Sequence, residues 1–472
     1  MPTRPAPAEA GSSTDGAGGA PSSKRARVAP AVPVAPYSLL PADAPALDDV
    51  LAAAHAAGRK CPVPFRTGLF LAPMVRSGSL PTRLLSLQYG ASLVWGPEIV
   101  DRAIMGCTRV VNEDTGLVSF VKDEKEIFTT HPVERKQVIF QLGSANAAWA
   151  YEAIKFVTAH DDVAGVDLNC GCPKPFSTIG GMGAHLLTTP DILCDVLRAM
   201  RRAAPPHVSV SCKIRLLPSR EETQALVRQI LRLGIIDNLT VHCRTKEMRP
   251  REPALLDRLR EVVEIVREET GGKLPLCCNG DAWDWNEAKR IMEMTGVTSV
   301  MIARGAEANP SCFAPRGVSS IADEVAPQYV RYAAYFNNNF GNSKFCMMQF
   351  TLKPSSNFAP HAPVLPNARS KKQLSEVRQG MERAKTIEEM AQVFGVDVEA
   401  VRAAKAEEIL APVRKALEAR EEGELKQDQE LKKATERGAE ISQETVAAAK
   451  QEEHSAAPSV QEPAPERPIV VA

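Results

Sequence analysis

The sequence predicts a (β/α)8 barrel at residues 60–320, and three observations lead to this prediction. Apolar segments of strand length recur eight times, and most are followed by a segment with helical periodicity. The strand segments are almost continuously apolar, as expected where helices cover a parallel sheet. Eight such units fit into this stretch, which has the usual size of such a barrel, ~250 residues.

The elements follow one another regularly along the chain. The eight expected strands are residues 69–75, 92–100, 137–143, 165–170, 208–215, 238–244, 274–280 and 299–305. Helical periodicity is clearest at 219–234 and 284–296. An insertion at 101–136 follows the second strand, and its segment "LVSFVKDEKEIFTTH" has the pattern of a hairpin.

Composition changes on both sides of the barrel. Residues 1–45 are rich in Pro, Ala, Gly and Ser, which predicts a disordered tail. Residues 325–410 are expected to form a smaller all-helical domain. Residues 411–472 are charged and lack apolar periodicity, so a solvated helix and a disordered tail both remain open. Near the start, Lys24, Arg25 and Arg27 form a short basic cluster, either a nuclear address or an inert patch.

Net charge and hydropathy exclude few classes of protein by themselves. Basic and acidic residues number 57 each, so net charge indicates no acidic partner. The N-terminus lacks the apolar segment of a secretory signal, and no apolar run approaches the ~18 residues of a membrane span. We therefore expect a cytoplasmic protein, a nuclear one or both, without membrane contact. Its eleven cysteines are expected to be reduced thiols.

The barrel predicts where chemistry takes place. Active sites of such barrels lie at the C-terminal ends of the strands, and these ends carry polar groups although the strands are apolar. The residues at these ends are Pro73, Met74, Glu98, Gln141, Asn169, Cys172, Lys213, Arg215, His242, Arg244, Asn279, Asp281 and Arg304. So many polar groups converging on one rim predict an active site.

The groups in this ring favour a flat, anionic ligand. The last two strands end in "CNGDA" and "ARGAE", where glycine lets backbone N–H groups approach a phosphate, and Arg304 can pair with it. Lys213 and His242 can stabilise negative charge on a heterocycle, while Met74 and Gln141 can contact its ring. Flavin mononucleotide (FMN) fits this combination. A sugar phosphate fits the phosphate half equally well.

Short motifs make a family resemblance specific. The segments "LAPMV", "FQLG", "VDLNCGCPK", "GGMGAHLL", "CKIR", "VHCRT", "CNGD" and "VMIARGA" occur in an order and spacing that resemble the tRNA-dihydrouridine synthases. The resemblance covers roughly residues 65–400. It is greatest to the eukaryotic branch that reduces uridine 20 of the tRNA D-loop.

The resemblance implies a reaction and a set of roles. Reduced FMN delivers a hydride to C6 of uracil, Cys172 of the "GCP" triplet protonates C5 as general acid, and NADPH or NADH re-reduces the flavin, although no separate dinucleotide motif is visible. The cofactor residues implied are Pro73, Met74, Val75, Gln141, Lys213, His242, Asn279, Gly280, Asp281, Ala303 and Arg304. The candidate substrate residues are Asn169, Lys174, Arg215 and Arg244.

The two cysteines of "NCGCP" admit three interpretations. A zinc site would require further Cys or His pairs at ligand spacing, and the other cysteines are scattered over separate strands, so we expect no metal. A redox pair usually has two residues between its cysteines. We therefore expect Cys172 to be the working thiol and Cys170 to be a small packing residue.

The segment after the barrel is suited to nucleic acid. Between Arg331 and Lys385 there are nine Lys or Arg residues and two Glu residues. The candidates for phosphate contact are Arg369, Lys371, Lys372, Arg378, Arg383 and Lys385. A tRNA partner accounts for this excess, because a stacked uridine must be pulled out of the fold to react.

Two other functions stay open at this point. A flavin barrel that acts on a free pyrimidine shares the cofactor and the thiol, but it leaves the basic segment without a use. A non-catalytic RNA-binding protein would retain the fold without turnover. Protein partners and oligomeric state are not indicated by the sequence.

Overall fold

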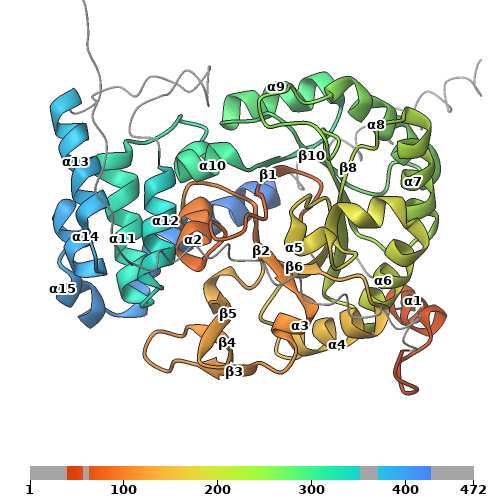
Figure 1. Cartoon of the computed structure of the whole chain (residues 1–472), viewed down its shortest axis with the longest axis horizontal. Helices are drawn as coiled ribbons and strands as arrows, with labels where there is room; N and C mark the ends of the chain where they lie inside the picture. Colours follow the sequence, from red (N-terminus) through yellow and green to blue (C-terminus); the bar gives the residue numbers. More distant parts are fainter. Residues whose placement is uncertain (1–39, 57–62, 351–369, 427–472) are drawn as a thin grey trace, which may run out of the picture. The chain divides into compact units, whose positions relative to one another are not determined.

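The computed structural model describes residues 40–56, 63–350 and 370–426. Eight parallel strands form a closed barrel in the order β1-β11-β10-β9-β8-β7-β6-β2. Figure 1 shows helices around these strands. The barrel strands are β1 (Gly68–Leu71), β2 (Leu93–Val100), β6 (Val138–Gly143), β7 (Gly165–Cys170), β8 (Ser209–Arg215), β9 (Asn238–His242), β10 (Leu276–Asn279) and β11 (Ser299–Ile302). The predicted (β/α)8 barrel is therefore confirmed.

Helices surround the barrel. They are α1 (Leu47–Ala56), α2 (Leu80–Gln88), α3 (Asp101–Ile104), α4 (Ala147–Val157), α5 (Pro175–Thr178), α6 (Pro190–Ala203), α7 (Arg220–Arg232), α8 (Leu256–Thr270), α9 (Trp285–Thr295) and α10 (Arg304–Ala308), with 3₁₀ turns η1 (Pro132–Glu134), η2 (Gly183–Thr188) and η3 (Pro310–Phe313). Local signals set the ends of the two helices predicted most clearly. Ser219 caps α7 and Asp284 caps α9 by accepting backbone hydrogen bonds, and α9 ends at Gly296, which has φ of 80°.

The insertion after β2 forms a small sheet of its own. Its hairpin consists of β4 (Val118–Lys122) and β5 (Lys125–Thr130), which pair antiparallel as predicted. A third strand, β3 (Thr108–Val111), pairs with β4 and was not expected. Its side chains are mostly exposed, so hydrophobic periodicity did not reveal it.

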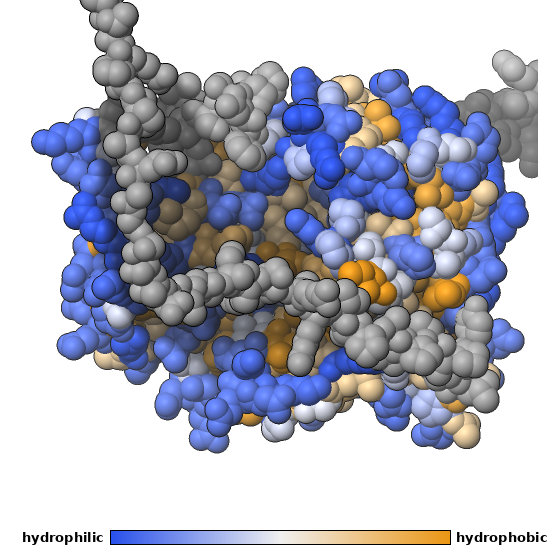
Figure 2. Space-filling view, viewed as in Figure 1, coloured by the Kyte–Doolittle hydropathy of each residue, from blue (hydrophilic) through white to orange (hydrophobic). Residues whose placement is uncertain are grey.

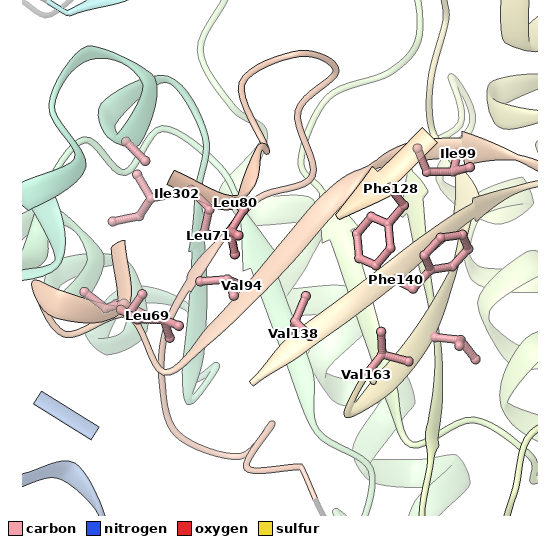
Figure 3. Packing of buried hydrophobic residues seen from close by; sticks show 14 of the residues in the cluster. Leu69, Leu71, Leu80, Val94, Ile99, Phe128, Val138, Phe140, Val163 and Ile302 are labelled. Carbon is pink, nitrogen blue, oxygen red and sulfur yellow. The ribbon is translucent and has the colours of Figure 1, made fainter. Parts of the chain in front are cut away.

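Each barrel strand has two buried faces. Leu69 and Leu71 belong to the large cluster between strands and helices, of which Figure 3 shows part. Phe70 points to the other side and belongs to a second cluster inside the barrel, where it packs against Phe65 and Trp95 with ring centroids 6.4 and 5.6 Å apart. Apolar side chains therefore fill the interior near β1 and β2.

The side chains of β7, β8 and β9 that face the inside of the barrel are polar, which differs from the expectation of continuously apolar strands. Asp167 and Ser211 are fully buried and face each other, with Ser211 Oγ donating to Asp167 Oδ1 over 2.7 Å. Thr240 Oγ1 receives a hydrogen bond from Asn238 Nδ2 at 3.1 Å. These hydrogen bonds reduce the cost of burying the polar groups, although Asn238 Oδ1 has no hydrogen-bond partner among the described residues.

A helical segment follows the barrel. It contains a π-helical turn (Ile321–Val325) and the helices α11 (Ala326–Tyr335), α12 (Phe340–Gln349), α13 (Lys371–Arg383), α14 (Ile387–Val393) and α15 (Val398–Ala403). Helical residues also run from 406 to 426, where a charged tail was expected to begin. Helix α11 packs on α2, and Tyr332 Oη donates to Gln88 Oε1 at 2.7 Å. Of the predicted tails, 1–45 and 411–472, the parts at 1–39 and 427–472 lie outside the described residues.

The surface is mainly hydrophilic on the face drawn in Figure 2, with hydrophobic residues in small separate patches. Exposed large hydrophobic side chains in the described chain include Phe176 and Ile179 on and just after α5. None of the described helices combines the length and the apolar character needed to cross a membrane.

A buried ion pair joins α2 to the insertion. Arg83 Nη2 and Glu134 Oε1 lie 2.7 Å apart, with side-chain exposures of 1% and 0%. We predict that Glu134→Ala lowers the free energy of unfolding by about 3–5 kcal/mol, because it leaves the Arg83 charge buried without its partner. Urea unfolding measures the loss. Lys136→Ala breaks an exposed pair with Glu421 and should cost less than about 1 kcal/mol; equal losses would contradict the prediction.

Candidate active site

Cys172 lies in a turn held just beyond the end of β7. Asn169 Oδ1 accepts hydrogen bonds from the backbone N–H groups of Gly171 and Cys172, both at 2.9 Å. On the other side, the Ala184 N–H donates to the Cys172 carbonyl at 2.9 Å. Cys172 is half-buried, whereas the other described cysteines, Cys170 among them, are all buried. The turn thus presents one thiol at the barrel mouth.

The surroundings of Cys172 keep its thiol protonated. Burial, and next the neighbouring Glu98 carboxyl, raise the pKa of Cys172 to about 11. Burial also raises the pKa of Glu98, which accepts a hydrogen bond from Ser177 Oγ at 2.9 Å. At neutral pH the sulfur therefore carries a proton that it can give to a basic atom.

A chain of hydrogen bonds inside the barrel supports this turn. Asn169 Nδ2 donates to Gln141 Oε1 at 3.0 Å, and Gln141 Nε2 donates to Asp167 Oδ2 at 2.8 Å. Burial raises the pKa of Asp167 to about 6, although three side-chain donors and Lys213 act in the opposite direction. Asn169 and Gln141, predicted to contact substrate and cofactor, thus also position the Cys172 turn.

Cationic groups gather on β8 and β9. Lys213 and His242 are half-buried, and neither Lys213 Nζ nor the His242 ring makes a hydrogen bond within the described residues. Burial, followed by the Arg215 charge, lowers the pKa of Lys213 to about 8. Burial and the charge of Lys213 lower the pKa of His242 well below its usual value. The site therefore offers an ammonium group and a neutral imidazole to a ligand.

Three predicted arginines are held mainly by protein groups. Arg215 donates to the carbonyls of Gly171 and Thr245 at 2.6 and 3.1 Å, next to the thiol turn. Arg244 is buried and pairs with Asp281. Arg304 also pairs with Asp281, at 2.6 Å, and its guanidinium lies 5.1 Å from the Trp283 ring centroid. Asp281 therefore positions two cations and reduces their net charge.

The remaining predicted residues lie at strand ends or just beyond them. Pro73 and Met74 are half-buried after β1, whereas Val75 and Lys174 are exposed. At β10, Asn279 Nδ2 donates to the Met301 carbonyl at 3.0 Å. Gly280 follows Asn279 and Ala303 follows β11, both half-buried. The closed barrel brings all of the predicted strand-end residues to one mouth.

Two groups in the site were not among the predicted site residues. Glu98 was recognised as a polar strand end, but its contact with Cys172 was not foreseen. Ser177, which binds Glu98, gave no signal beyond its place in the "GCPKPFS" segment. Among the described residues there is no group of three or more His, Cys, Asp or Glu side chains placed to hold a metal ion.

The sequence is similar to known proteins over most of the barrel and the helical segment. The family model for dihydrouridine synthases (Dus) matches residues 70–404. The tRNA-dihydrouridine(20) synthase [NAD(P)+] of Schizosaccharomyces pombe is 47% identical over 286 residues, covering 59% of this chain and 58% of that protein. The Saccharomyces cerevisiae protein of the same name is 38% identical over 300 residues, covering 59% of this chain and 76% of that protein. The tRNA-dihydrouridine(20a/20b) synthase [NAD(P)+] of S. cerevisiae is 30% identical over 242 residues, covering 51% and 60%.

Proposed function

This chain belongs to the dihydrouridine synthase family, and we propose on that basis that it reduces the C5–C6 double bond of a tRNA uridine to 5,6-dihydrouridine. The proposed uridine is position 20 of the D-loop, the position in the names of the two relatives with the highest identity reported above. The observation that supports the chemistry most directly is Cys172, a half-buried thiol held protonated at the barrel mouth. The chain matches just over half of the S. pombe relative's length, so the full activity is inferred from the site.

FMN is the proposed cofactor, with NADPH or NADH as the reductant. The site fits this cofactor in its chemistry, since the side chains of Lys213 and His242 make no hydrogen bonds within the described residues and can meet an electron-rich ring. Arg304, Gly280 and Ala303, at the ends of β10 and β11, are the proposed phosphate-binding residues. When bound, reduced flavin supplies a hydride for C6 of uracil.

Residues of this chain donate the proton that C5 receives. Addition at C6 leaves negative charge on C5 and the adjacent carbonyl of the pyrimidine. The Cys172 S–H group gives its proton to C5 as general acid, since burial and Glu98 keep it from ionising earlier. The Asn169 cap fixes the backbone of the thiol turn, which places the sulfur.

The helical segment at 325–410 is the proposed tRNA-binding domain. Lys372 and Lys385 are exposed and can meet phosphates. Arg378, also predicted to contact phosphate, donates to the Met348 carbonyl at 3.0 Å and pairs with Glu382 at 3.1 Å. Arg369 lies outside the described residues.

A reduction assay on tRNA that lacks dihydrouridine tests the function. The protein is supplied with FMN and NADPH, and each D-loop position is mapped for the reduced base. Product at position 20 supports the whole proposal, and product at another uridine retains the chemistry but corrects the position. Reduction of free uracil without reduction of tRNA would favour the small-pyrimidine alternative.

Replacing Cys172 should slow turnover strongly without unfolding the protein. In the same assay we predict that Cys172→Ala retains FMN and binds tRNA but is about 10²–10⁴-fold slower, the usual contribution of a general acid. Cys170→Ala is the matched control, because Cys170 is fully buried outside the mouth and should react at nearly the normal rate. The reverse result would show that the wrong thiol has been chosen.

The affinity for FMN should depend on the charge of Lys213. The pKa of Lys213 is lowered to about 8, so the side chain is charged below this pH and neutral above it. We predict that the FMN dissociation constant, measured by fluorescence quenching, rises as pH increases through about 8. Lys213→Arg keeps its charge and should remove this dependence. An unchanged profile in Lys213→Arg would assign the effect to another group.

Helix α13 begins with Lys371 and Lys372, which are predicted to contact tRNA phosphates. Replacing both with Ala should weaken tRNA binding at any sequence and lower the log–log salt slope by about 2. Filter binding over a salt series measures both quantities. Lys125→Ala, an exposed charge on the β4–β5 hairpin, is the control. If the two variants behave alike, the RNA surface lies elsewhere.

A further inference from the structure

We propose that Glu98 is the positioning residue of the Cys172 thiol: its buried carboxylate holds the sulfur in the S–H form and drives the return of the proton after the sulfur has protonated carbon. This inference rests on the proposed function for its role in turnover. The state of the thiol itself can be measured without tRNA, so the two can fail separately.

A bulge in β2 brings Glu98 to the barrel interior. Trp95 pairs with Ile139, but the next register partners are Glu98 and Gln141, so β2 contains one residue more than β6 in this interval. Side chains alternate along a strand, and without the extra residue Glu98 would face the outer helices. The bulge falls at Gly96-Pro97, where proline interrupts the strand pairing.

The surrounding residues leave room for this carboxyl and little else. A Cβ atom at Gly143 on the neighbouring strand would lie 2.8 Å from Glu98 Oε1. A Cβ atom at Gly183 would lie 2.4 Å from Ser177 Oγ and 3.2 Å from Cys172 Cβ. Both glycines therefore permit the close approach of Glu98, Ser177 and Cys172.

Glu98 has no cationic partner. The residue is 8% exposed, Ser177 Oγ donates to Oε1, and Oε2 has no hydrogen-bond partner among the described residues. No Lys or Arg of the described chain forms an ion pair with it. A buried carboxylate without a counterion is costly, so this group resists a second negative charge beside it.

The charged groups that act on the Cys172 thiol are Glu98 on β2 and Arg215 on β8. Cys170 on β7 is fully buried and packs in the large cluster between strands and helices. Arg215 alone would favour a thiolate, but burial and Glu98 outweigh it and raise the pKa of Cys172 to about 11. The resting pair therefore contains a thiol beside a carboxylate.

The proton balance follows directly. The S–H bond of Cys172 breaks as the C5–H bond of the substrate forms, which leaves a thiolate next to the carboxylate. Two adjacent negative groups in a buried site favour uptake of one proton from water, and the unpartnered Oε2 of Glu98 can accept it and pass it to the sulfur. No redox change occurs at either residue.

Alkylation of Cys172 by iodoacetamide tests the proposal, since the thiolate is the reactive form. The FMN-loaded enzyme is sampled between about pH 7 and about pH 9, and the peptide containing Cys172 is quantified by mass spectrometry. Removing a neighbouring like charge shifts a pKa by roughly one unit or more. We therefore expect Glu98→Gln to be alkylated about tenfold faster than wild type at a given pH.

Two further variants keep the test decisive. Asp101→Asn removes another buried carboxyl from the end of the same strand, one bound by Ser144 Oγ at 2.6 Å, and should leave the alkylation rate unchanged. Glu98→Asp keeps a carboxylate at this position and should be alkylated more slowly than Glu98→Gln. This difference between two variants of one residue would not arise from general loosening of the fold. If Glu98→Gln does not fold, a rate in Glu98→Asp close to that of wild type supports the role of the charge, and tenfold acceleration would contradict it.

An alkylation rate in Glu98→Gln equal to that of wild type would overturn the proposal, as would acceleration in Asp101→Asn of the same size. If alkylation follows the expected order while tRNA is not reduced, the role of Glu98 stands and the proposed function falls. If tRNA is reduced but alkylation does not depend on Glu98, the function stands and this inference falls.

Discussion

Closure of the parallel sheet is the constraint on which the rest of the structure depends. Strand β1 is hydrogen-bonded to β2 on one side and to β11 on the other, so no barrel strand is an edge. Because all eight strands run in parallel, their carboxyl ends meet at one mouth. Residues that are far apart in sequence, such as Cys172, Lys213 and Arg304, are thereby brought to a single site without any direct attraction between them.

The same closure limits what the barrel can hold inside. Apolar side chains near β1 and β2 pack against one another, but β7, β8 and β9 contribute Asp167, Ser211 and Thr240 to the interior. Each of these is hydrogen-bonded, which removes most of the cost of burying it. The hydrogen bonds from Asp167 through Gln141 to Asn169 then connect the buried interior with the Cys172 turn. Stability and placement of the thiol therefore depend on the same hydrogen bonds.

The sequence indicated most of the fold and part of the site. Eight apolar segments predicted the strands, because burial on both faces leaves a composition that is visible without contacts. The pairing of Arg244 and Arg304 with Asp281 was not predictable, since it joins residues of different strand ends. The role of Glu98 depends on one extra residue in β2, and only the observed register shows that it faces inward. The exposed strand β3 lacked the hydrophobic pattern that revealed the others.

The ionisable groups of the site are divided by strand. Glu98 and Cys172, on β2 and after β7, form a pair in which burial disfavours added negative charge. Lys213 and His242, on β8 and β9, form a pair in which burial disfavours added positive charge. The first pair gives up a proton only to an atom that becomes strongly basic, and the second attracts a ligand that carries negative charge. Such a division suits a reaction in which an electron-rich cofactor and a proton donor act on the two carbons of one double bond. The pair that holds the proton and the pair that attracts negative charge lie on different strands, so neither neutralises the other before the substrate arrives.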